Sequence, residues 1–162
     1  MTAAAALYSE IIMNEFEFTS VIDEKYYDAL ESLVYFNKQQ RLYYRNILDG
    51  IEKYGEPKII RNNNQLKLEV GNNTSTQCIF ANHEGKPVGM LLYTRNHPHN
   101  IHIVHIALDN DFTLKGQFSK SMLVSRMLKQ VQEIAKRIKG INTITIEYTS
   151  NSHRVYSIPL KK

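Results

Sequence analysis

The spacing of hydrophobic positions changes along this chain, from a helical repeat in the first third to a strand repeat in the middle. Residues 15–22 alternate as an extended segment. Residues 24–36, EKYYDALESLVYF, then place apolar side chains three and four positions apart behind Asp23, which predicts a helix capped by that aspartate. A second helix is predicted over residues 39–54, where Gly55 ends the apolar stripe.

From residue 58 onward apolar and polar side chains alternate. The alternating segments are residues 58–60, 65–70, 76–83, 87–95 and 100–108. They are separated by the turn-forming sequences NNN, GNNTS, HEGK and NHPH. The pattern predicts an antiparallel meander of strands.

The last third returns to a helical repeat. Residues 117–139 carry one apolar stripe opposite a basic face, and Gly140 is a natural helix end, so this segment predicts a long amphipathic helix. Residues 141–149, INTITIEYT, predict a further strand. Residues 150–157 are expected to form a short helical turn before Pro159.

Length and composition indicate one folded domain over residues 1–162, with residues 1–14 as a loose extension. The chain has 43% hydrophobic and 22% charged residues, which is ordinary for a globular protein. It has no run of roughly 20 apolar residues and no basic segment ahead of its first apolar stretch, so we expect neither a membrane span nor a signal peptide. The single cysteine, Cys78, fits a reducing compartment, and we expect a cytoplasmic protein.

Charge is unevenly distributed. Residues 1–56 hold 5 basic and 10 acidic side chains, whereas residues 57–162 hold 15 basic and 6 acidic ones. The basic part favours an anionic ligand, either a phosphate-bearing cofactor or a nucleic acid, although scattered lysines and arginines also occur on ordinary solvated surfaces.

The order of segments, strand, helices, strand run, long helix and strand, resembles that of the GCN5-related N-acetyltransferase family over residues 15–156. The strongest local match is ALDNDFTLKGQFSKSML, residues 107–123, which is similar to the family's Q/R-x-x-G-x-G/A turn around the pyrophosphate of acyl-coenzyme A. Gly116 matches the middle glycine, whereas Thr113 and Phe118 stand at the other two positions. The resemblance implies an α+β fold with a mixed, mostly antiparallel sheet flanked by helices.

The resemblance also implies a function and a site. The implied reaction is acetyl transfer from acetyl-coenzyme A to an amine of a small molecule or protein, with His105 or His102 as base and Tyr156 as acid. The cofactor-binding residues that it implies are Leu108, Lys115, Gly116, Gln117, Phe118, Ser119, Lys120 and Asn151. Because only six residues follow Tyr156, the family's final strands would be absent or supplied by a partner, and we expect a homodimer or protein complex on the open sheet edge.

Four histidines, His97, His99, His102 and His105, lie within nine positions and raise the question of a metal. The odd spacing of His102 and His105 places them on opposite faces of a regular strand, so we expect no metal site and an ordinary polar strand. Ser119 and Ser121 are interpreted as N-cap residues of the long helix.

Two further functions stay open. A non-catalytic relative could use the same fold to bind a protein or ligand, since two of the three turn positions depart from the family. A nucleic-acid-binding module would fit the basic part of the chain, although no recognised RNA or DNA motif is present.

Overall fold

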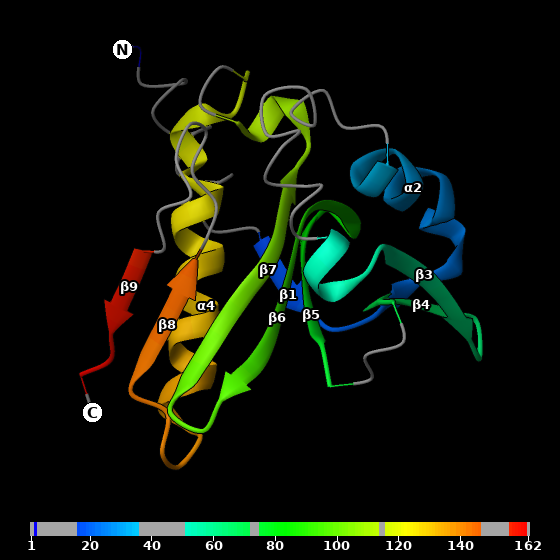
Figure 1. Ribbon diagram of the computed structural model, residues 1–162. Coiled ribbons are helices and arrows are strands. Elements are labelled where there is room, and N and C mark those ends of the chain that lie inside the picture. The colour runs from blue at the N-terminus through cyan, green and yellow to red at the C-terminus, as the bar shows by residue number, and fades with distance from the viewer. Residues whose placement is uncertain are drawn as a thin grey trace.

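A six-stranded sheet forms the centre of the molecule (Figure 1), in the order β1-β5-β6-β7-β8-β9. The computed structural model describes residues 2, 16–35, 51–71, 75–113, 116–146 and 156–161. All neighbouring strands are antiparallel except β7 and β8, which are parallel. The strands are β1 (Phe16–Thr19), β5 (Gln77–His83), β6 (Lys86–His97), β7 (Asn100–Leu108), β8 (Thr143–Ile146) and β9 (Tyr156–Pro159). The predicted mixed, mostly antiparallel sheet with flanking helices is confirmed.

Helix α4 (Leu123–Lys136) covers one face of this sheet. Its buried side chains recur every four residues and enter the same core as β5, β6, β7 and β8: Leu123, Met127, Val131 and Ala135. Full burial of a Leu, Met or Val side chain contributes roughly 1.5 to 3 kcal/mol. The helix is shorter than the predicted 117–139: it begins later, because residues 119–121 form the separate 3-10 turn η4 (Ser119–Ser121), and it ends at Lys136.

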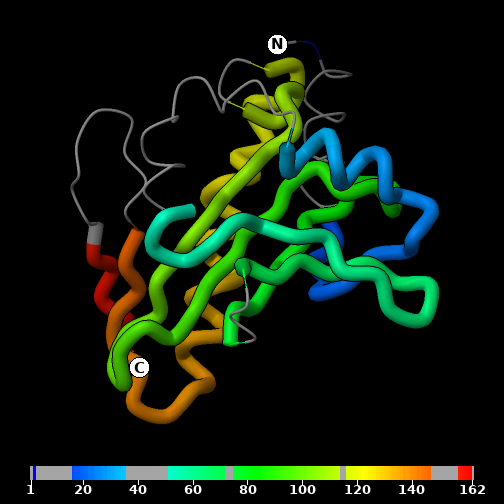
Figure 2. The backbone as a smooth tube through the Cα atoms, turned by 45° about the vertical axis from the view of Figure 1, so that its right-hand side comes forward, coloured from blue at the N-terminus to red at the C-terminus, as the bar shows by residue number. Residues whose placement is uncertain are grey.

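A second, three-stranded sheet in the order β2-β4-β3 packs on the opposite face, together with helix α2 (Tyr27–Tyr35). Its strands are β2 (Ile22–Asp23), β3 (Pro57–Asn62) and β4 (Gln65–Val70). Figure 2 shows the β3–β4 hairpin crossing in front of the main sheet, with α4 behind it. The prediction of one continuous meander was therefore wrong. The buried side of β4, with Leu66, Leu68 and Val70, packs face to face on the main sheet instead of extending its edge.

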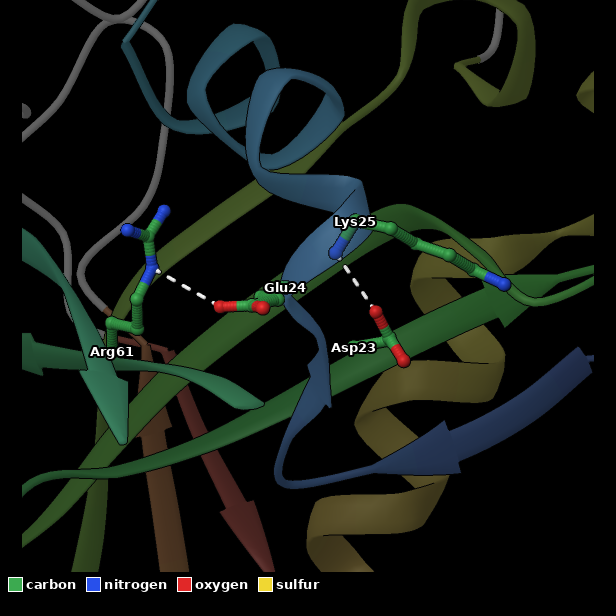
Figure 3. A network of polar contacts seen from close by, with 4 residues as sticks. All are labelled: Asp23, Glu24, Lys25 and Arg61. Carbon is green, nitrogen blue, oxygen red and sulfur yellow. Dashed lines mark hydrogen bonds and ion pairs between the residues drawn. The ribbon is translucent and has the colours of Figure 1, made fainter. Parts of the chain in front are cut away.

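The start of the first helical segment is fixed by Asp23, which the sequence pattern identified as a helix cap. Asp23 accepts a hydrogen bond from the Lys25 backbone N–H at 2.8 Å and caps the turn η1 (Glu24–Tyr26), which leads directly into α2 (Figure 3). The predicted cap is confirmed. Beside it, Arg61 of β3 lies 3.5 Å from Glu24, an exposed ion pair of small energetic value that joins the hairpin to η1.

The C-terminal segment corrects a further expectation. Residues 156–157, predicted as the end of a helical turn, belong to β9, which pairs with β8 in antiparallel register, Tyr156 with Ile146. Ile158 and Leu160 pack against the α4-side core, which explains why this tail extends the sheet. The edge of β8 is therefore covered by the chain itself.

Other expectations fall largely outside the described residues. Of the second predicted helix, only residues 51–54 are described, and they are helical up to Gly55, whose φ is +97°. Lys115, Asn151 and nearly all of residues 1–14 are not described. No helix in the described ranges is long and apolar enough to cross a membrane.

Candidate functional site

Among the described residues, strand β7 has neighbours on both sides over only part of its length. On one side β6 runs antiparallel to it as far as Leu108. On the other side the described part of β8 pairs with residues 100–103, although β7 continues to residue 108. Within the described part of the chain, residues 104–108 thus have an open edge, and such an edge presents peptide N–H and C=O groups that a ligand can bind.

A β-bulge lies where this open stretch begins. Leu92 pairs with His105 and Tyr93 with Ile103, so Val104 is an extra residue in β7. Ile103 and Ile106 both pack into the α4-side core, despite their odd spacing. Strict alternation therefore fails between residues 103 and 106, and the predicted separation of His102 and His105 onto opposite faces does not hold.

His105 is a buried imidazole on the open half of β7. The residue is only 5% exposed, and Nε2 has no hydrogen-bond partner among the described residues. Burial lowers the pKa of His105 from 6.5 to about 4, so the ring is neutral at pH 7. A buried polar atom without a partner costs roughly 1 to 3 kcal/mol, which makes Nε2 a candidate to contact a ligand.

His102 lies on the paired half of β7 in a contrasting environment. Nδ1 of its buried ring is 2.7 Å from the Thr145 hydroxyl on β8, and the ring lies 5.6 Å from that of Tyr54. His97 and His99 are exposed at the β6–β7 turn. Among the described residues, no group of three or more His, Cys, Asp or Glu side chains is arranged to hold a metal ion.

In the turn that follows β7, several backbone N–H groups donate hydrogen bonds to carbonyl groups of the same turn. The N–H groups of Gly116, Phe118 and Ser119 donate to carbonyls of Thr113, Asp111 and Gly116. A Cβ on Gly116 would collide with the Asn110 carbonyl, so glycine is required here for packing within the turn. These three predicted phosphate-binding N–H groups therefore already have acceptors.

The first turn of α4 offers a different anion-binding group. Its N-cap is Met122, with φ +52° and no side-chain hydrogen bond to the helix, whereas the expected caps Ser119 and Ser121 lie in η4. The first N–H groups of an α-helix have no intrahelical acceptors and attract anions. Met122 is 59% and Val124 39% exposed, and these are the exposed large hydrophobic side chains of the described residues. An uncapped helix end bordered by exposed apolar groups suits a ligand that is part phosphate and part apolar.

The other predicted site residues are distributed around this region. Leu108 is buried at the end of β7, while Gln117 and Lys120 are exposed on the turn before α4. Tyr156 opens β9 opposite Ile146, which in turn pairs with Ile103 of β7. The structure thus brings the backbone of Tyr156 level with the end of the β7–β8 pairing, and its side chain is not described.

An aromatic cluster beside the turn was not identified from the sequence. Phe118 lies 5.0 Å from Phe112 and 6.4 Å from His83, while Phe16 lies 5.6 Å from Phe112, all between ring centres. The ring of Phe118 therefore packs into this aromatic cluster. The cluster borders a pocket of about 290 Å³, lined by Tyr26, His83, Glu84, Lys86, Val88, Asp109, Asp111, Phe112 and Phe118. Its members come from distant segments and no local pattern marks them.

The family of the chain follows from comparison with known sequences. A sequence model of the Acetyltransferase (GNAT) family matches residues 40–158, well over half of the 162 residues. The chain therefore belongs to this family. No curated protein sequence gives a significant match.

A solved structure of similar length agrees with this fold. The chain is similar to a possible acetyltransferase from Clostridium difficile 630, with 10% identity, 86% of this chain and 83% of that chain covered, and a TM-score of 0.50. An acetyltransferase from Salmonella typhimurium that modifies the N-terminal serine of 50S ribosomal subunit protein L7/L12 shares 19% identity over 83% of this chain and 72% of that chain, with a TM-score of 0.47. A GNAT family acetyltransferase from Elizabethkingia anophelis with acetyl-CoA bound shares 22% identity over 45% of this chain, with a TM-score of 0.38, and the present chain spans 43% of its length.

Proposed function

We propose that this protein transfers an acetyl group from acetyl-coenzyme A to an amine. Family membership supports the reaction class. The observation that carries the proposal for this chain is the buried Nε2 of His105, which has no partner among the described residues and lies on the half of β7 that the described part of β8 does not cover. This position combines an open strand edge, which can bind an extended ligand, with a neutral imidazole, which can accept a proton.

Acetyl-coenzyme A would lie between the open edge of β7 and the start of α4. The N–H groups of the first turn of α4, which have no acceptors within the helix, would hold the pyrophosphate, and the exposed ammonium group of Lys120 would add positive charge. Met122 and Val124 would contact the apolar part of the cosubstrate. Lys115 and Asn151 remain proposed contacts from outside the described residues.

The chemistry requires two proton transfers. The amine nitrogen attacks the acyl carbon, the thioester C–S bond breaks, and the coenzyme A thiolate leaves. His105, or His102 nearby on the same strand, would accept the proton from the amine. Tyr156 would return a proton to the thiolate, a role supported by the register that sets it opposite Ile146 at the end of the β7–β8 pairing.

An assay of thiol release tests this proposal directly. Incubation with acetyl-coenzyme A and a panel of amines, including small polyamines and peptides with free N-termini, should release coenzyme A detectable by a disulfide reagent. Cys78 should add little background, because it is buried and burial raises the pKa of its thiol. Binding alone is tested by melting, since coenzyme A at 100 times its Kd stabilises by about 2.7 kcal/mol. Binding without turnover across the panel would favour the non-catalytic alternative.

The acceptor class and the assembly are separate questions. The acceptor is an amine of a small molecule or of a protein. The predicted homodimer loses its main reason, because β9 covers the β8 edge and is itself short and ended by Pro159, features that discourage edge pairing. It stays a prediction, and light scattering at micromolar concentration would decide it by a mass of 18.8 kDa or twice that value.

A further inference from the structure

A ladder of hydrogen-bonded polar side chains runs from β7 to β8 along the paired half of β7. Thr143 donates its hydroxyl to Oδ1 of Asn100 at 2.7 Å. The Asn100 amide nitrogen then donates to Oδ1 of Asn96 and to the Thr145 hydroxyl oxygen, each at 2.8 Å. The Thr145 hydroxyl is also 2.7 Å from Nδ1 of His102. The parallel register of Asn100 with Thr143 and of His102 with Thr145 aligns these groups.

The donors available in this ladder determine the direction of its hydrogen bonds. In the orientation that the structure has, the Asn100 amide oxygen accepts from Thr143, and both of its N–H groups are used as donors to Asn96 and Thr145. Thr145 accepts from Asn100, so its single hydroxyl proton is available to His102, the other partner of that oxygen. Nδ1 of His102 then accepts this hydrogen bond, and the proton of the neutral ring resides on Nε2.

We infer that Thr145 is a positioning residue that holds His102 in the Nε2–H tautomer, which leaves His105 as the proton acceptor. In this state Nδ1 of His102 is occupied by the Thr145 proton and Nε2 carries a proton, so neither nitrogen can act as a base. Nε2 of His105 is buried without a partner in the described residues. The tautomer of His102 does not depend on the proposed function. The assignment of His105 as the base rests on the proposed function.

Imidazole nitrogen NMR of the whole protein tests the tautomer without an assay of activity, because protonated and unprotonated ring nitrogens have well-separated chemical shifts. In the wild type, His102 should show a proton on Nε2. Thr145→Val should remove this preference, and Thr145→Ser, which retains the hydroxyl, should restore it. Asn100→Asp should reverse it, since the new carboxylate would take the Thr145 proton and His102 would donate from Nδ1.

A wild-type proton on Nδ1 would overturn the inference, as would an unchanged His102 spectrum in both Thr145→Val and Asn100→Asp. If Thr145→Val fails to fold, Thr145→Ser and Asn100→Asp still decide it. On the enzymatic side, His105→Gln should lower kcat by a hundredfold or more and His102→Gln, which keeps a donor, by about fivefold. The reverse order would overturn the base assignment. An Nε2–H tautomer in a protein that transfers no acetyl group would support the inference and refute the proposed function.

Discussion

The two halves of β7 differ in what surrounds them. Residues 100–103 have strands on both sides, and polar side chains such as Asn100 and His102 find partners on β8. Residues 104–108 have a neighbour on one side only among the described residues, and His105 lies there with an unpartnered nitrogen. Residues 100–103 therefore have a structural role, whereas residues 104–108 have the features of a ligand-binding site. Changes in the paired half should therefore affect stability, and changes in the open half should affect chemistry.

The largest expected effect comes from removing the imidazole of the open half. His105→Leu keeps an apolar side chain in a buried position and should lower the rate of acetyl transfer roughly a hundredfold to ten-thousandfold, the usual contribution of a general base. The free energy of unfolding should stay equal or rise, because a buried polar atom without a partner is removed. Steady-state kinetics and denaturant titration measure the two quantities. His97→Ala, at an exposed histidine, is the control, and equal rates in both variants would remove His105 from the site.

The same buried imidazole should make stability depend on pH. Its pKa in the folded protein is about 4, against about 6.5 when unfolded, so the unfolded chain binds the proton more readily. The stability associated with the neutral ring is fully present above pH 6.5 and is lost as pH falls towards 4, by about 3 kcal/mol. Denaturant titrations of wild type and His105→Leu across this range isolate the effect by difference. Parallel curves would show that His105 is not buried as a neutral ring.

A smaller effect is expected at the start of α4, where the open region ends. Met122 is exposed with φ +52°, a conformation that Asn and Asp both tolerate, so Met122→Asp and Met122→Asn differ mainly in charge. A carboxylate beside the proposed pyrophosphate site should weaken coenzyme A binding roughly tenfold relative to the amide. Isothermal titration calorimetry compares the two dissociation constants, and identical values would place the phosphates elsewhere.

The smallest effect is expected beyond the paired half, in β9. Ile158 is partly buried against the α4-side core and pairs with Ile144 of β8. Ile158→Ala should lower the free energy of unfolding by about 1 to 2 kcal/mol, less than a fully buried truncation, and leave acetyl transfer unchanged. Thermal melting provides the measurement, with the exposed Ser157→Ala as the matched control. A large loss of activity without loss of stability would contradict the assignment of stability to the paired half of β7 and of chemistry to its open half.

Local pattern predicted the elements whose physics is local. The four-residue repeat of Leu123, Met127 and Val131 identified α4, and Asp23 identified the start of the first helix, because each signal lies within a few residues of the element it describes. Alternation likewise predicted β3 to β7. It specifies which residues share a face but not which sheet a strand joins, so the departure of the β3–β4 hairpin to its own sheet was not predictable.

The candidate site was predicted less well, because its main features depart from regular strand alternation and from the usual helix-cap residues. Val104 is a good strand residue like its neighbours, and nothing in its sequence context marks the bulge that changes the face of His105. Ser119 and Ser121 are better caps than Met122 by residue type, yet the η4 turn takes both serines. The open half of β7 depends on which residues of β7 the described part of β8 pairs with, which is a property of tertiary pairing.

The parallel pairing of β7 with β8 also has a consequence for how the chain folds. Asn100 meets Thr143 only after the intervening residues, including all of α4, have closed a long loop. Closing such a loop has an entropic cost before any contact compensates for it, and non-local pairing slows folding. The hairpin formed by β5 and β6 has only a short turn to close, so it should form early and the β7–β8 pair late. Until that step, both halves of β7 would expose an edge, and the newly made protein would be most prone to aggregation in this interval.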